Sequence, residues 1–133
     1  MTSLLDEALD AWADARRGVV AELKRVPPSQ LHFRPEPRAR SAAEIVLHVV
    51  DTGLMWTGEL TNPGGDFTRK SFQAFLREYG TPASSRPRDK TGFLRLLRNA
   101  HAISVRRIQD ARPEQYFQPA KYRSTSLLSM AEV

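Results

Sequence analysis

The sequence predicts an all-α protein built as a helical bundle. Three long segments, residues 3–26, 41–60 and 89–111, have apolar residues recurring at three- and four-residue steps, which is typical of amphipathic helices. No segment alternates apolar and polar residues as a half-buried strand does. The chain has 133 residues, which is the size of one domain, so we expect a single domain over residues 1–133.

The first predicted helix, 3–26, has an apolar stripe that runs from Leu5 to Val26. Its basic side chains, Arg16 among them, are expected to lie away from that stripe. The helix is predicted to stop before Pro27, because proline disfavours a helical conformation in the residue that precedes it.

Residues 27–40 are predicted to form an extended loop, because four prolines interrupt them. Leu31 and Phe33 lie two positions apart, so both would point inward from an extended chain. The loop is therefore expected to pack on the body of the domain.

The second predicted helix, 41–60, begins with a capping box made by Ser41 and Glu44. Its apolar residues cover nearly the whole circumference, and they are Ile45, Val46, Leu47, Val49, Val50, Leu54, Met55, Trp56 and Leu60. A helix that is apolar all round is a buried one. We therefore expect this helix to be the central one of the bundle.

Two further helices follow in the second half of the chain. Residues 68–79 predict a short helix that ends at Gly80. Asp89 is the predicted N-cap of the last long helix, 89–111.

A final helix is predicted to begin at Thr125 or Ser126, with only a few residues left before Val133. The fourth wall of the bundle would therefore be short or truncated, because a long helix spans about 30 Å and this one far less. We expect a second chain, or residues beyond Val133, to cover the apolar trough that such a bundle leaves open.

Composition excludes several classes of function. There is no cysteine, which excludes a disulfide framework, a thiolate zinc site and a cysteine nucleophile. No apolar run is long enough to span a membrane and no signal peptide is recognisable, so we expect a cytoplasmic protein. The net charge is +5, but the arginines are scattered along the chain, so we interpret the charge as a solvated surface and do not expect nucleic-acid binding.

His48 is the first candidate for chemistry. Glu44 and Asp51 share its face of the second helix, one turn before and one turn after it. A histidine with carboxylate neighbours suits a metal site in which the carboxylate fixes the imidazole tautomer. The same spacing also fits a histidine at the border of a core, paired with Glu44 or Asp51 within the helix.

His101 and Arg34 are the other candidates for contact with a substrate. His101 lies on the inner stripe of the helix 89–111, where a hydroxyl such as that of Ser104 or a backbone carbonyl would satisfy a structural imidazole. The alternative is that His101 belongs to a site. Arg34 offers a guanidinium that can receive a carboxylate or phosphate with two hydrogen bonds.

The stretch from Val26 to Trp56 resembles the DinB-like (DNA-damage-inducible) superfamily, which includes YfiT-like proteins. In that family a loop of L-x-aromatic-R-P type precedes a capping serine and a helix that carries E-I-x-x-H. The matching residues here are Leu31, Phe33, Arg34, Pro35, Ser41, Glu44, Ile45 and His48.

The resemblance implies an up-down-down-up four-helix bundle that is commonly a homodimer. Many members hold one divalent metal, such as Ni, Zn or Fe, through three histidines, and His48 matches the first of these ligands. The other two come from an H-x-x-x-H pair on the fourth helix, which this sequence does not contain before Val133. The metal triad is thus incomplete, with Glu132 as a candidate replacement ligand.

Two functions follow from the resemblance and stay open. The first is a metal-dependent enzyme, either a thiol-dependent S-transferase or a hydrolase, in which His48 faces the interior cleft. The second is a non-catalytic dimeric bundle that binds a small molecule or a protein partner.

Overall fold

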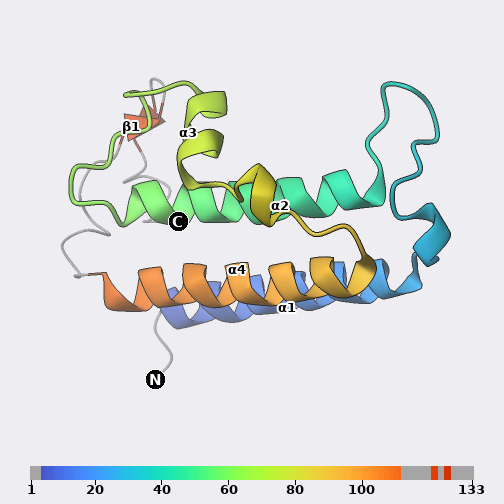
Figure 1. Cartoon of the computed structure of the whole chain (residues 1–133). Helices are drawn as coiled ribbons and strands as arrows, with labels where there is room; N and C mark the ends of the chain where they lie inside the picture. Colours follow the sequence, from blue (N-terminus) through green and yellow to red (C-terminus); the bar gives the residue numbers. More distant parts are fainter. Residues whose placement is uncertain (1–3, 112–120, 123–124, 127–133) are drawn as a thin grey trace.

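Three long helices dominate the computed structural model, which describes residues 4–111, 121–122 and 125–126 (Figure 1). They are α1 (Leu4–Arg25), α2 (Ala42–Leu60) and α4 (Lys90–Asp110). α1 runs in one direction, and α2 and α4 both run in the other (Figure 1). The predicted all-α bundle is therefore confirmed, with the first three long helices in up-down-down order.

The capping residues that the sequence predicted begin two of these helices. The Ser41 hydroxyl accepts a hydrogen bond from the Glu44 amide at 3.1 Å, and the Glu44 carboxylate accepts one from the Ser41 amide at 3.2 Å. Asp89 accepts a hydrogen bond from the Gly92 amide at 2.8 Å and caps α4. Each cap satisfies amide groups that the first turn of a helix leaves without partners.

Short elements connect the long helices. A 3-10 turn, η1 (Pro28–Gln30), follows α1, and a second one, η2 (Ala83–Ser85), precedes α4. The short helix α3 (Phe72–Tyr79) packs on α2, on the side away from α1 and α4 (Figure 1). It ends at Gly80, as predicted, where the amide donates to the Leu76 carbonyl at 2.8 Å.

The prediction that a last helix begins at Thr125 or Ser126 is wrong for those two residues. They form a short strand, β2 (Thr125–Ser126), which pairs antiparallel with β1 (Lys121–Tyr122). Threonine and tyrosine favour extended backbone, which explains the strands at these positions. The remainder of the predicted helix, 127–133, lies outside the described residues.

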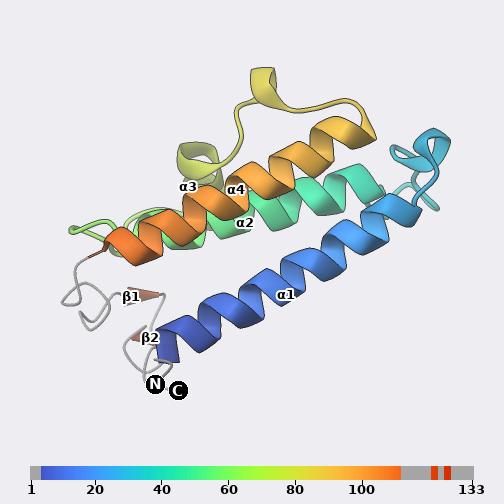
Figure 2. The same ribbon diagram turned by 90° about the horizontal axis from the view of Figure 1, so that it is seen from below.

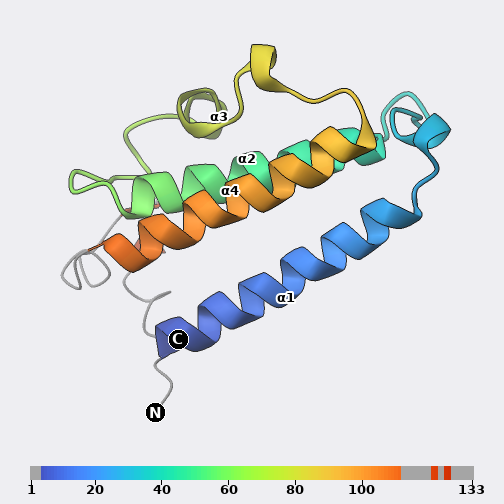
Figure 3. The same cartoon turned by 60° about the horizontal axis from the view of Figure 1, so that its bottom comes forward.

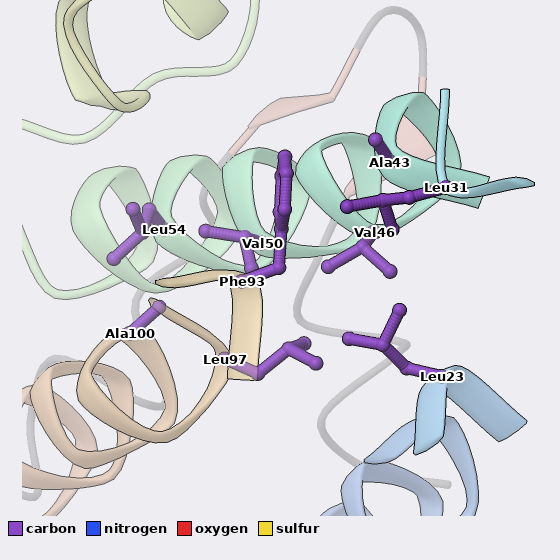
Figure 4. Packing of buried hydrophobic residues seen from close by; sticks show 9 residues of the cluster. All are labelled: Leu23, Leu31, Ala43, Val46, Val50, Leu54, Phe93, Leu97 and Ala100. Carbon is purple, nitrogen blue, oxygen red and sulfur yellow. The ribbon is translucent and has the colours of Figure 1, made fainter. Parts of the chain in front are cut away.

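The main core lies where the three long helices meet (Figure 4). α2 and α4 lie side by side along their length (Figures 2 and 3). Within α1, all of whose residues are described, only Leu23 is buried, and it points toward the side chains of the other two helices (Figure 4). The buried cluster consists of Leu23, Leu31, Ala43, Val46, Val50, Leu54, Phe93, Leu97 and Ala100.

α2 packs on α3 and α4, but α4 is the helix that packs closely on both of the other long helices, so the prediction that α2 is the central one is not confirmed. The prediction that α2 is buried all round is wrong, since Ile45 is 51% exposed and Val49 is 41% exposed. These two side chains lie one turn apart on the same face of α2.

The prediction that Leu31 and Phe33 both point inward is half right. Leu31 is buried, but Phe33 is 60% exposed. The cause is local, because Leu31 has helical backbone angles and the Phe33 amide donates to the Gln30 carbonyl at 3.1 Å. The backbone turns here, so the alternation of an extended chain does not apply.

A buried ion pair joins α2 to the segment before α3. The Glu59 side chain is fully buried, and Arg69 donates to its two carboxylate oxygens at 2.6 and 2.7 Å. The Tyr79 hydroxyl and the Asp66 amide donate to the same carboxylate at 2.7 and 2.8 Å. Four hydrogen bonds therefore compensate the loss of hydration of this carboxylate.

No helix in residues 4–111 combines the length and the apolar character needed to cross a membrane.

Candidate functional site

A small cavity of about 80 Å³ lies among α1, α2 and α4 and is partly open to solvent. Most of its surface is apolar, and three polar side chains, Arg16, His101 and Ser104, contribute to its wall. No aspartate or glutamate of residues 4–111 contributes to the lining. Its residues are Trp12, Ala15, Arg16, Val19, Val49, Val50, Gly53, Leu97, Ala100, His101 and Ser104.

Two buried nitrogen atoms at this cavity lack hydrogen-bond partners among the described residues. They are Nε of Arg16 on α1 and Nδ1 of His101 on α4. Leaving a buried polar group unpaired costs about 1–3 kcal/mol, so such atoms usually have a protein, water or ligand partner. Two other hollows, one along α4 and one beside α3, contain no such atom among their lining residues.

The surroundings of His101 keep its imidazole neutral near neutral pH. Its ring packs edge-on against Trp12, with ring centroids 5.4 Å apart. Burial, together with the positive charges of Arg16 and Arg17, lowers the pKa of His101 below its ordinary value. Neither a hydroxyl such as that of Ser104 nor a backbone carbonyl satisfies Nδ1 of His101 in the described structure. The Ser104 hydroxyl accepts a hydrogen bond from Thr57 at 3.2 Å.

His48 lies on α2 with its side chain half-buried, and it is not part of the cavity wall. In the described structure no hydrogen bond joins its ring to Glu44 or Asp51. Thr52 donates to the His48 backbone carbonyl at 2.8 Å, which involves the main chain only. His101 lines the cavity and His48 does not, so the two histidines do not share this site.

The two carboxylates on the His48 face have other partners. Glu44 forms a two-point ion pair with Arg34, at 2.7 and 2.8 Å. The hydrogen bonds from Arg34 and from the Ser41 amide lower the pKa of Glu44 to about 2. Arg34 is thus occupied by an internal partner, although both side chains stay partly exposed.

Asp51, the second carboxylate, is nearly buried and holds the end of α3. It accepts a hydrogen bond from the Thr81 amide at 2.8 Å. It therefore fixes the chain after α3 on α2 and does not orient His48.

The described residues do not fit a divalent metal held by three histidines. The chain has three histidines in all, and His32 lies beside Phe93, with its Nε2 2.8 Å from the Arg88 carbonyl oxygen. His101 lies eight residues after Phe93, which is about 12 Å further along α4. In residues 4–111, no three His, Asp or Glu side chains gather as a metal site. Glu132 lies outside the described residues.

Arg16 was missed by the sequence analysis, which placed it away from the apolar stripe. It follows Trp12 by four positions and precedes Val19 by three, and this spacing puts it on the same face as both. Its stem can pack with them while its guanidinium reaches the cavity edge. The spacing in the sequence could therefore have identified Arg16 as a residue of the inner face of α1.

By its fold and its cavity the protein belongs to the structural class of all-α bundles, with three long helices and a small, mostly apolar cavity between them. A sequence model of the DinB superfamily matches residues 11–133, so the chain belongs to the DinB superfamily. This match confirms the resemblance and includes every residue that lines the cavity. No curated protein and no solved structure matches the chain.

Proposed function

We propose that this member of the DinB superfamily is a non-catalytic bundle that binds a small molecule in the cavity among α1, α2 and α4. One observation carries the proposal: two of the residues that line this cavity, Arg16 and His101, each have a buried side-chain nitrogen without a partner in the described structure. A mostly apolar hollow with a few polar groups directed into it is the usual form of a ligand site. Its volume suits a fragment of a few non-hydrogen atoms.

The proposal predicts that blocking the cavity mouth abolishes binding. Trp12 lines the cavity, and a Trp56→Phe background leaves it as the single tryptophan of the chain. Short-chain acids, amides and alcohols are titrated against its fluorescence. At least one of these classes is expected to bind, and Ala15→Leu is expected to weaken that binding about tenfold or more, because the added side chain fills the opening.

Ala21→Leu is the matched control for this experiment. Both alanines are exposed on α1, but Ala21 does not line the cavity. The control is expected to bind the probe as the parent protein does. Equal affinities in the two leucine variants, or no binding of any class, would contradict the proposal.

The metal-dependent enzyme requires ligands that the described residues do not supply to His48. We therefore expect purified protein to carry far less than one Ni, Zn or Fe per chain by elemental analysis. We also expect its thermal unfolding to be unchanged by a chelator, since no folding energy depends on metal binding. One metal per chain that disappears in a His48→Ala variant would support the enzyme instead.

Three expectations remain proposals that rest on the family resemblance and composition. They are the single domain over residues 1–133, the homodimer and the cytoplasmic location. Ile45, which is exposed and does not line the cavity, belongs to a surface that a second copy of the chain could cover.

A further inference from the structure

We propose that the cavity among α1, α2 and α4 selects ligands that carry a carboxylate on a short apolar tail, with Arg16 and His101 receiving the carboxylate. This inference deepens the proposed function and rests on it. The unpartnered nitrogens are the starting observation, because both belong to side chains that can donate a hydrogen bond to an anion.

The charge of the cavity wall favours an anion over a cation. Arg16 carries a permanent positive charge, and it forms no ion pair within the described residues. Its neighbour Arg17 does form one, with Asp14, so the two arginines differ in what they offer a ligand. Among the described residues no carboxylate lines the cavity, so no negative charge on its wall offsets the repulsion that a cationic ligand would meet from Arg16.

Arg16 and His101 both line this cavity, from α1 and from α4. Arg16 is close enough to His101 for its charge to lower the pKa of the imidazole. A neutral imidazole with Nδ1 protonated donates one hydrogen bond, and Nε of Arg16 donates another. A carboxylate has two oxygens and can accept from both donors at once.

The remaining wall selects the tail of the ligand. Apart from Ser104, whose hydroxyl is engaged by Thr57, it consists of aliphatic side chains, a glycine and the Trp12 ring. A volume of about 80 Å³ limits the enclosed part of the ligand to a short chain, while the open side lets a longer molecule extend into solvent. Ordered water is the competing occupant, since water can also satisfy the two nitrogens.

The test compares butanoate with butanamide, which have nearly the same size and shape but differ in charge. Binding to the full chain is followed by amide chemical shifts in NMR spectra. Butanoate is expected to bind at about millimolar concentration. Butanamide is expected to bind roughly tenfold or more weakly, because a hydrogen bond to a charged group is stronger than one to a neutral group.

Arg16→Met and Arg17→Met form a matched pair of variants. Each removes one positive charge from α1, but only Arg16 lines the cavity. Arg16→Met is expected to weaken butanoate binding by about tenfold or more and to leave butanamide unchanged, whereas Arg17→Met should weaken butanoate binding less than about threefold.

The possible results distinguish a failure of the carboxylate assignment from a failure of the proposed small-molecule site. Equal affinity for butanoate and butanamide, or equal losses in the two methionine variants, overturns the carboxylate assignment and leaves a neutral-ligand site standing. Failure of every probe class overturns both proposals and indicates a cavity filled by water. If Arg16→Met does not fold, the comparison of the two probes on the unmodified chain decides the assignment.

Discussion

Replacing Arg69 with methionine is expected to lower the free energy of unfolding by about 3 kcal/mol. Arg69 provides two of the four hydrogen bonds that the fully buried Glu59 carboxylate receives. Its removal leaves a buried charge with the Tyr79 hydroxyl and the Asp66 amide as its remaining partners among the described residues. Because the Arg69 side chain is 30% exposed, we expect the lower end of the range for broken buried pairs.

Lys70→Met is the matched control, since it makes the same kind of change at the next position. Lys70 pairs with Glu78, and both of these side chains are about one-third exposed. Such a surface pair contributes about 0–1 kcal/mol. Urea unfolding followed by circular dichroism measures both variants, and equal losses would show that Glu59 does not depend on Arg69.

The cost of Arg69→Met is also expected to depend on pH. Burial acts to raise the pKa of Glu59, but the hydrogen bonds from Arg69, the Asp66 amide and Tyr79 outweigh it and lower that pKa to about 2. A carboxyl group whose pKa is lower in the folded state stabilises the protein above its unfolded value, here 4.5, and loses that contribution as the pH falls toward 2. The difference in unfolding free energy between the parent protein and Arg69→Met should therefore have its full size at pH 7 and shrink below about pH 4.

Replacing Phe93 with alanine is expected to cost about 3–5 kcal/mol of unfolding free energy. Phe93 is 4% exposed and belongs to the buried cluster where α2 and α4 meet (Figure 4). Its removal loses the transfer energy of a large ring and leaves a void that the surrounding helices fill only in part. Equilibrium unfolding in urea measures the loss.

Phe33→Ala is the control for this prediction. It tests whether the loss of stability depends on where the phenylalanine lies in the structure, and not simply on removing a phenylalanine. Phe33 is 60% exposed and lies in the loop between α1 and α2. Surface substitutions of this kind usually change stability by no more than about 0.5 kcal/mol. Similar losses for the two phenylalanines would contradict the placement of the core.

Local patterns predicted the helices well. The periodic apolar stripes located α1, α2 and α4 to within one or two residues, and Ser41 and Asp89 marked two helix starts, because these signals depend on neighbours within one or two turns. The exposure of Ile45 and Val49 was not predictable in the same way, because it depends on which element lies beside that face of α2.

The site was less predictable because its contacts join distant parts of the sequence. Helical spacing suggested that Glu44 pairs with His48, but Arg34 and the Ser41 amide bind the Glu44 carboxylate instead. His101 was expected on the inner stripe of its helix, and it lines the cavity, but the absence of a partner for its Nδ1 depends on residues from other helices and could not be predicted from its own helix.

The central claim is that a carboxylate ligand occupies the cavity bordered by Trp12, Leu97 and His101. Its most direct test is a search for intermolecular nuclear Overhauser effects between butanoate and the side chains of the protein. We expect contacts from the butanoate methyl and methylene protons to Trp12 and Leu97. Contacts confined to the hollow beside α3, around Phe67 and Phe75, or no contacts at all, would contradict it.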